Sequence, residues 1–313
     1  MSRVGRVRRI TAAAAVALSA ALVLAGCADN GTAPALPGQS DTSAYDAVIA
    51  GAPVADASAI TPGSWADKIK QRGKLLVGGT DAGPLFSLKD PATGKVTGFD
   101  AGLSQMLARY IIGQPTTELT ITTVDTRETL IQNNTVDAVF ATYTITPARA
   151  QKVAFAGPYY ESGDAIMVKA DNTSINAVGD LNGKTVATES NSTAALALKQ
   201  FAPGANVLLF QEDAQCVAAV QQGRADAYVL DQGILISDAS TNPAVKVVGQ
   251  PFTKEPYGIG VPLSDPSAKQ FVNAWLQKIY ADGSWAKLWK ATIGTIVKGD
   301  PPAPPTIGSV PGS

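Results

Sequence analysis

The stretch Val136-Asp137-Ala138-Val139-Phe140-Ala141-Thr142-Tyr143-Thr144-Ile145-Thr146-Pro147-Ala148-Arg149 joins a β-rich run to the start of a helix. The run from Val136 to Ala141 predicts a strand. Thr146 is a favourable N-cap, Pro147 suits the first helical position, and Arg149 then lies in the first turn. A helix start offers free N–H groups and a positive dipole end beside that guanidinium, so the stretch predicts an anion site. A surface ion pair is the alternative interpretation.

β-rich runs and helical stretches alternate on both sides of this stretch. The first series is Lys74 to Val77, a helix Phe99 to Ile112, Leu119 to Val124, a helix Arg127 to Asn133 and Val136 to Ala141. The second series is Lys184 to Thr188, a helix Ser192 to Phe201, Val207 to Gln211, a helix Asp213 to Gly223, Asp226 to Leu230 and Val245 to Val248. Two such series predict two α/β lobes. The last helical stretches, Ser267 to Ala281 and Ser284 to Thr292, could cover either lobe. They carry Trp275, Trp285 and Trp289 at helical spacing, which predicts core packing.

Two segments that pair Pro and Gly with aromatics, 158–163 and 254–258, are interpreted as crossings between the lobes, with ordinary loops as the alternative. Two crossings make the second lobe an insertion into the first and place a ligand cleft between lobes that close around hinge residues. The expected organisation is a signal peptide at 1–27, a disordered tether at 28–63, lobe 1 at 64–161 and 258–299, lobe 2 at 162–257, and a Pro-rich tail at 300–313.

The N-terminus has the composition of an export signal. Basic residues precede an apolar run from Ile10 to Leu24, which is shorter than a spanning helix usually needs. Leu24-Ala25-Gly26-Cys27 resembles the lipobox of bacterial lipoproteins. The resemblance implies that Cys27 is lipidated and anchors an extracytoplasmic protein to the lipid bilayer. A short membrane anchor is the alternative.

Composition excludes several classes of function. The chain of 313 residues contains no histidine, which excludes Ser/His/Asp and Cys/His catalytic systems and His-ligated metal sites. Its net charge is −1, with no basic run outside the signal, so no nucleic-acid partner is expected. No metal and no cofactor are expected either. If Cys27 is lipidated, Cys216 has no disulfide partner, and a buried small hydrophobe is the expected role.

Five motifs, in this order, give the chain a resemblance to a known family. They are Gly98-Phe99-Asp100, Ala141 to Arg149, Phe155-Ala156-Gly157-Pro158-Tyr159-Tyr160, Asp180-Leu181-Asn182-Gly183-Lys184 and Gly223-Arg224-Ala225-Asp226-Ala227. Over about Lys74 to Trp289 the chain resembles the family 3 solute-binding proteins of polar amino-acid ABC transporters, and within them the glutamate-binding branch. The resemblance implies a two-lobed, type II periplasmic-binding-protein fold, a monomer, and delivery of an amino acid to a membrane permease.

The resemblance also assigns roles to residues that hold the ligand's backbone groups. It implies that Arg149 and Thr144 bind the α-carboxylate. It implies that Asp231 binds the ammonium group, with the Thr142 carbonyl as a further acceptor; a helix N-cap is the alternative role for Asp231. In lobe 2, Glu189-Ser190-Asn191-Ser192-Thr193 follows a strand and precedes a helix, so Ser192 can cap while its neighbours' N–H groups point outward. The family usually has glycine at Asn191, which puts contacts by Ser192 and Thr193 in doubt, although Asn tolerates a left-handed backbone.

Recognition of the ligand's distal end depends on Arg127 and on the loop that contains Asp81. The resemblance implies that Arg127 contacts a side-chain carboxylate, with a solvated helix charge as the alternative. Relatives often carry a basic residue near Thr80, and this chain does not. The expected ligand is therefore glutamate first, then aspartate, asparagine or glutamine.

Two rival functions remain open at this point. A membrane sensor could replace the permease as partner, which would make the protein an amino-acid-sensing lipoprotein. An enzyme on the same fold, such as a dehydratase or a cell-wall lyase, would need a placed acid or base, and Glu189 and Glu161 are the candidates. The sequence favours a binding protein over an enzyme.

Overall fold

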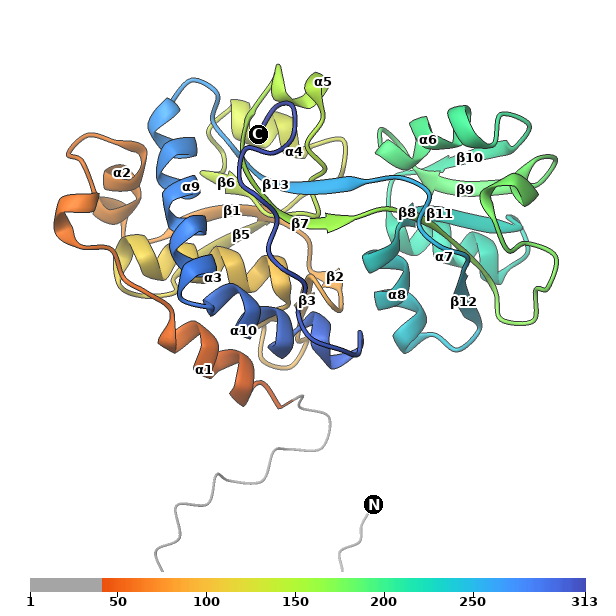
Figure 1. Cartoon of the computed structure of the whole chain (residues 1–313), viewed down its shortest axis with the longest axis horizontal. Helices are drawn as coiled ribbons and strands as arrows, with labels where there is room; N and C mark the ends of the chain where they lie inside the picture. The colour runs from red at the N-terminus through yellow and green to blue at the C-terminus, as the bar shows by residue number, and fades with distance from the viewer. Residues whose placement is uncertain (1–40) are drawn as a thin grey trace, which may run out of the picture. The chain divides into compact units, whose positions relative to one another are not determined.

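The computed structural model describes residues 41–313. The expected signal peptide, Cys27 and the part of the tether before residue 41 lie outside this range. Within it the chain forms a single compact unit with two lobes, each built on its own mixed β-sheet (Figure 1). No helix among the described residues combines the length and apolar character needed to cross a bilayer. The two-lobed α/β fold is as predicted.

The sheet of lobe 1 has the strand order β5-β1-β6-β13-β7. Its strands are β1 (Leu75–Gly79), β5 (Thr117–Ile121), β6 (Ala138–Val139), β7 (Ala154–Ser162) and β13 (Glu255–Val261). β5, β1 and β6 are parallel, and β13 runs antiparallel to both β6 and β7. The return of β13, far along the chain, into this sheet makes lobe 1 discontinuous.

Helices cover both faces of this sheet. They are α2 (Trp65–Arg72), α3 (Phe99–Ile112), α4 (Arg127–Gln132), α5 (Pro147–Ala150), α9 (Pro266–Ala281) and α10 (Ser284–Ala291), followed by the turn η3 (Ile293–Thr295). Neighbouring residues of β6 show the two faces, because Ala138 packs into the core under α3 and α9 while Val139 packs with Ile131 of α4. A small sheet of β2 (Ala82–Gly83), β3 (Ser87–Lys89) and β4 (Val96–Thr97) follows β1.

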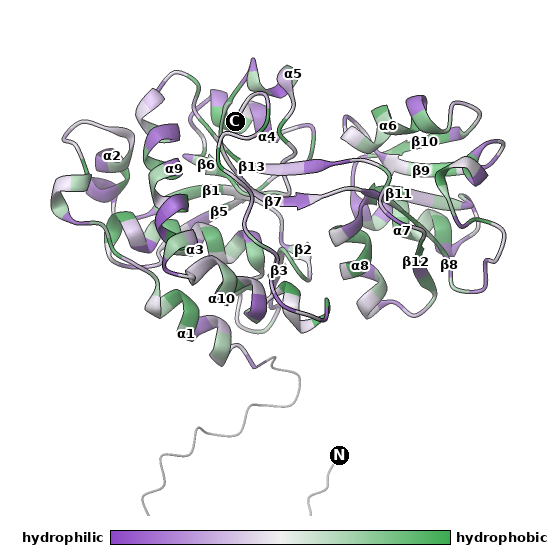
Figure 2. Cartoon of the chain, viewed as in Figure 1, coloured by the Kyte–Doolittle hydropathy of each residue, from purple (hydrophilic) through white to green (hydrophobic). Residues whose placement is uncertain are grey.

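The sheet of lobe 2 has the strand order β10-β9-β11-β8-β12. Its strands are β8 (Asp164–Lys169), β9 (Thr185–Glu189), β10 (Asn206–Phe210), β11 (Ala227–Asp231) and β12 (Val245–Val248). The helical elements of this lobe are η2 (Val178–Leu181), α6 (Thr193–Phe201), α7 (Asp213–Gln221) and α8 (Gln232–Thr241). Its core is separate from that of lobe 1 and contains the buried Cys216, as predicted. In Figure 2 the helices that cover the sheets carry both hydrophobic and hydrophilic residues.

The chain passes between the lobes on two neighbouring strands. β7 leads through Gly163 into β8, and the chain returns through Thr253 into β13, which pairs with β7. A Cβ atom on Gly163 would lie 2.4 Å from the carbonyl oxygen of Thr253, so only glycine allows the two crossings to approach this closely. In Figure 1 these strands connect the lobes, which is the arrangement that a hinge requires.

The described part of the expected disordered tether is ordered, so that prediction is wrong from residue 41 onward. α1 (Ser43–Gly51) and the turn η1 (Ala57–Ala59) occupy this region, and Tyr45 and Ile49 are buried in the core of lobe 1. Residues 28–63 have few apolar residues on average, so the helical spacing of Tyr45 and Ile49 was not recognised as a helix signal. Two residues four apart on one helix face suffice to dock a short helix against α3 and α10.

The Pro-rich end also packs against lobe 1 instead of forming a free tail. Residues 300–313 contain no helix or strand, yet the Gly308 N–H donates to the Gly157 carbonyl at 2.9 Å. Ile307 and Val310 lie against the cores of the lobe. Five prolines restrict the chain before folding, so few apolar contacts are needed to hold it.

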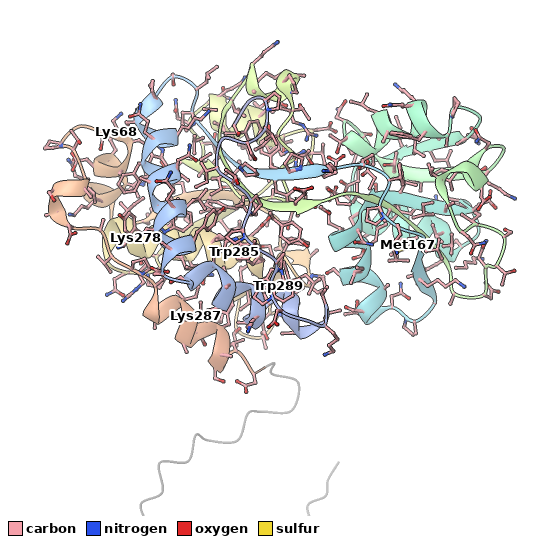
Figure 3. All side chains as sticks on the ribbon, viewed as in Figure 1. Lys68, Met167, Lys278, Trp285, Lys287 and Trp289 are labelled. Atoms are coloured by element: carbon pink, nitrogen blue, oxygen red, sulfur yellow. The ribbon has the colours of Figure 1, made fainter. Side chains whose placement is uncertain are left out.

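The three tryptophans of α9 and α10 pack into the core of lobe 1, as their spacing predicts. Trp275, Trp285 and Trp289 are all at most 4% exposed. Trp285 and Trp289 turn inward from α10, whereas Lys287 between them points away (Figure 3). The Trp285 indole N–H donates to the carbonyl of Tyr159 on the β7 crossing at 3.0 Å, which connects α10 to the hinge.

Candidate functional site

A cavity of about 460 Å³ lies between the lobes. Lobe 1 lines it with the loop after β1, the start of α4 and the loop after β6, which include Asp81, Arg127 and Thr142. Lobe 2 lines it with Glu189 at the end of β9 and with residues of α7 and α8. The wall is therefore made where strands of both sheets end, which is the usual position of ligand sites in α/β folds.

The lobes touch directly around this cavity. An Arg149 Nη2 donates to the Asn191 carbonyl at 3.2 Å, and the Asn191 amide donates to Asp125. On the other side, the Leu85 N–H donates to Ser237 Oγ of α8 at 3.1 Å. Each of these bonds joins lobe 1 to lobe 2, so the structure shows the lobes closed on each other.

Arg149 lies where the sequence predicts it, in the first turn of α5. Thr146 caps this turn by accepting the Arg149 N–H at 3.2 Å, and Pro147 occupies the first helical position. The residue is only 8% exposed, and its guanidinium donates to the Thr144 carbonyl at 2.9 Å. The surface ion pair considered as an alternative is excluded, because the side chain is buried at the junction of the lobes.

Asp231 comes to the same junction from lobe 2. It ends β11 and precedes α8, but its side chain makes no capping hydrogen bond, so the alternative role of helix cap is wrong. The residue is 5% exposed, and Oδ1 has no partner among residues 41–313. Burial, followed by the charge of Glu255, raises the pKa of Asp231 to about 7, while Arg149 acts in the opposite direction. A buried carboxylate with a free oxygen is prepared for a cationic group.

The start of α6 forms the lobe 2 side of the contact with Arg149. Asn191 has φ +56°, so the left-handed turn expected where relatives have glycine is retained. Ser192 is the predicted N-cap: its Oγ accepts the Ala195 N–H at 3.1 Å and donates to the Glu189 carbonyl at 2.7 Å. With its hydroxyl engaged in this way, Ser192 shapes the turn, and the partly buried Thr193 follows it at the first helical position.

Thr142 lines the lobe 1 wall of the cavity, and Thr144 lies beside it at the lobe junction. Thr142 has φ +45°, an uncommon conformation for a β-branched residue and one that concentrates at functional sites. Its N–H donates at 2.7 Å to the buried Asp100, which also accepts from Tyr159. Thr144 is 4% exposed. Asp100 belongs to one of the sequence motifs, and the structure gives it the role of holding this strained backbone.

Arg127 is buried, so the interpretation as a solvated helix charge is wrong. It opens α4, is 5% exposed, and lies with its guanidinium carbon 3.9 Å from the ring centre of Tyr143. One Nη donates to the Ala141 carbonyl at 3.1 Å, whereas Nε has no partner among residues 41–313. Burial and then the charge of Arg149 lower the pKa of Arg127 to about 10. The side chain is held by stacking and one bond, with donor capacity left for a ligand.

Two buried carboxyl groups beside Asp231 were not predicted from the sequence. Asp164 pairs with Asp231 across β8 and β11, and Glu255 begins β13, so both stand at the crossings. Asp164 is fully buried, and burial followed by the charge of Asp231 raises its pKa to about 9. Both residues lie in or next to the segments interpreted as crossings. Their position beside Asp231 depends on the strand register, which the sequence alone does not reveal.

A second acidic group lines the lobe 2 wall of the cavity. Glu189, Asp213 and Asp238 come from β9, α7 and α8, and the Tyr228 hydroxyl donates to Asp213 at 2.8 Å. Burial and then Asp213 raise the pKa of Asp238 to about 8. Glu189 was a candidate catalytic acid in the sequence; Glu161, the other candidate, is exposed and does not line this cavity.

The structure thus divides the predicted site residues into two groups. Asp81, Arg127 and Thr142 line the cavity itself. The remainder lie at the lobe junction beside it or at the start of α6: Arg149, Thr144, Asp231, Ser192 and Thr193. Among residues 41–313, no group of three acidic or Cys side chains has the arrangement of a metal site. Such a site suits a small molecule with both an anionic and a cationic group.

Known proteins agree with this architecture. Residues 75–295 match the bacterial extracellular solute-binding proteins, family 3. The glutamine-binding protein of Geobacillus stearothermophilus is 39% identical over 79% of this chain and 89% of its own length. The glutamate-binding protein GluB of Corynebacterium efficiens is 34% identical over 72% of this chain and 80% of its own length. A crystal structure of a mutant of ArgBP from T. maritima is 29% identical with a TM-score of 0.68, covering 74% of this chain and 99% of that chain. These relatives are binding proteins, and the chain belongs to the extracytoplasmic solute-binding proteins of family 3 rather than to an enzyme class.

Proposed function

We propose that this protein binds a polar amino acid whose side chain ends in a carboxylate or an amide, and delivers it to an ABC permease. Glutamate is the first candidate, followed by aspartate, asparagine and glutamine. One observation supports the proposal above the others: Arg149 of lobe 1 and the non-capping Asp231 of lobe 2 are buried at the same closed junction. They offer opposite charges to the two charged backbone groups of an amino acid.

In this proposal the α-carboxylate binds the Arg149 guanidinium, which can hold two carboxylate oxygens at once. The ammonium group binds Asp231 and relieves the cost of burying an unpaired carboxylate there. Because the two charges belong to different lobes, a ligand that binds both favours the closed arrangement. Closure excludes water and strengthens both interactions. Thr144 and the Thr142 carbonyl would complete the backbone contacts.

The distal end of the ligand would lie beside Arg127. Its unpartnered Nε and its position on the cavity wall favour a side chain that ends in an oxygen acceptor. Carboxylate and amide groups both supply such an oxygen, and the names of the relatives include a glutamine-binding and a glutamate-binding protein. Asp81, on the same wall, would contact the ligand from the loop after β1.

The membrane association of the protein is part of the same proposal. Lipidation at Cys27 would tether the binding unit outside the cell membrane, near a permease that recognises the closed lobes. Replacement of Cys27 by alanine should release the protein from the membrane fraction without changing amino-acid affinity. A membrane sensor as partner would be revealed if the protein co-purifies with a receptor and its deletion leaves uptake intact.

Calorimetric titration with the twenty amino acids tests the binding proposal. A ligand of roughly ten heavy atoms that uses these contacts efficiently should reach micromolar affinity or better, on the order of −8 kcal/mol. We expect acidic and amide amino acids to bind and to be recovered unchanged after incubation. Absence of binding by all four candidates, or selective binding of an apolar amino acid, would contradict the proposal.

A further inference from the structure

Glu189 and Arg127 line the same cavity from opposite lobes. Arg127 stands at the start of α4 in lobe 1, and Glu189 ends β9 in lobe 2. The two charges are close enough that each shifts the pKa of the other. A ligand side chain that enters between the lobes therefore meets a cation on one side and a carboxyl group on the other.

The surroundings of Glu189 are strongly acidic. Asp213 and Glu212 at the start of α7 and Asp231 at the end of β11 raise its pKa, whereas Arg127 lowers it. Asp238 of α8 senses the charge of Glu189 as well. Burial, followed by the charge of Asp213, raises the pKa of Glu189 to about 8. This raised pKa favours the protonated form of Glu189 near neutral pH before a ligand arrives.

Neither wall residue is fully satisfied by the protein. Arg127 is 5% exposed and its Nε has no partner among residues 41–313. Burial and neighbouring charges are the largest influences on the pKa of Glu189. An acidic cluster by itself does not indicate a ligand site. This cluster lines a cavity whose other side carries a buried guanidinium with a free donor, and that combination indicates a ligand site.

We propose that Glu189 distinguishes a carboxylate from an amide at the end of the ligand's side chain, with Arg127 as the fixed donor on the lobe 1 side. This rests on the proposed function and specifies how the same site discriminates. In its protonated form, Glu189 donates its O–H to a ligand carboxylate whose other oxygen binds Arg127. In its ionised form, it accepts an N–H from a ligand amide whose carbonyl oxygen binds Arg127.

The consequence is a pH-dependent choice between glutamate and glutamine. A ligand carboxylate beside ionised Glu189 places two like charges together in a partly buried site, so glutamate must bind with Glu189 protonated. As pH rises through the pKa of Glu189, that binding requires uptake of one proton, and glutamate affinity falls up to tenfold per pH unit. The amide is satisfied by either form of Glu189, because the protonated group still has a carbonyl oxygen that accepts. Glutamine affinity therefore changes much less.

Calorimetry on the full-length protein in detergent, with glutamate and glutamine from pH 6 to pH 9, tests this. The ratio of the two dissociation constants is the readout, because titration of Asp231 and of the ligand's backbone groups affects both ligands similarly. We expect the ratio of glutamate Kd to glutamine Kd to rise by about tenfold between pH 7 and pH 9. A ratio that stays constant across this range would overturn the proposal.

The variant Glu189→Gln assigns the effect to this residue. Its amide cannot ionise and still donates, so glutamate should bind with a ratio to glutamine that no longer depends on pH. Glu161→Gln removes the same charge at an exposed position that does not line this cavity, and should retain the wild-type dependence. A dependence that persists in Glu189→Gln would refute the role of Glu189. If neither ligand binds wild-type protein at any pH, the proposed function itself fails, which is a different result from a constant ratio.

Discussion

Replacement of Asp231 by asparagine should lower the affinity for the ligand without lowering the stability of the fold. The Asp231 side chain is buried at the lobe junction but makes no capping bond to α8, and its Oδ1 is unpartnered among residues 41–313. Asparagine has nearly the same shape and removes only the negative charge. The substitution should therefore weaken the ligand's ammonium contact and leave the local packing unchanged.

The expected loss of affinity follows from the kind of contact removed. A hydrogen bond to a charged group contributes about 1.5–3 kcal/mol. At 1.4 kcal/mol per factor of ten, that corresponds to an affinity loss of roughly 10- to 150-fold. The burial of Asp231 beside Asp164 and Glu255 places the expected value toward the upper end of this range.

The stability of the ligand-free protein should change in the opposite direction. The pKa of Asp231 is raised to about 7 in the folded protein, mainly by burial and then by Glu255. A carboxyl group with a raised folded pKa stabilises the protein only while protonated, so its contribution is present at low pH and lost as pH rises from about 4 to about 7. The asparagine introduced by Asp231→Asn does not ionise, so the variant should be as stable as wild type, or more stable, above pH 7.

Calorimetry with glutamate and glutamine gives the affinity, and thermal unfolding without ligand gives the stability. Asp171→Asn, at an exposed position of lobe 2 shortly after β8, is a matched control for charge removal. Two results would refute the reasoning. Unchanged affinity would remove Asp231 from the site, and a clear fall in melting temperature would show that its carboxylate supports the fold instead.

Two further substitutions test the Arg149 side of the junction. Arg149→Lys keeps the charge but cannot form two parallel bonds to a carboxylate, so titration should show at least about tenfold weaker binding, and full affinity would contradict the proposed carboxylate contact. Asn191→Ala and Asn191→Gly both remove the amide bond to Asp125, but only alanine is strained at φ +56°. The alanine variant should therefore have a free energy of unfolding in urea about 1 kcal/mol below that of the glycine variant; equal values would mean that the left-handed turn is not the constraint.

Local patterns predicted most of the regular structure, because capping and periodicity act over a few residues. The helix expected at Phe99 to Ile112 has those bounds, and the cap at Thr146, the cap at Ser192 and the left-handed Asn191 are present. The ordered α1 was missed, because an average over residues 28–63 conceals the two core residues that hold it. The packed C-terminal segment was missed for a similar reason, since its contacts are made by a few residues in a chain without periodicity.

The site shows a different limit. The sequence pointed to Arg149, Asp231 and Arg127, but it left open whether each was a surface charge, a helix cap or a ligand contact. Asp164 and Glu255 gave no signal, because their effect on Asp231 depends on strand register between segments far apart in the chain. Glu189 was noticed only as a possible catalytic acid, and its position opposite Arg127 depends on how the lobes meet.

The sequence by itself determined the two α/β lobes, the helix starts that carry Arg149 and Ser192, and the absence of histidine chemistry. Those properties follow from short-range preferences and composition, which any stretch of chain expresses locally. Only the tertiary structure decided which charges are buried and which of them face each other. Burial and pairing are set by the closure of one lobe on the other, and it is the removal of water there that turns ordinary surface residues into a selective site.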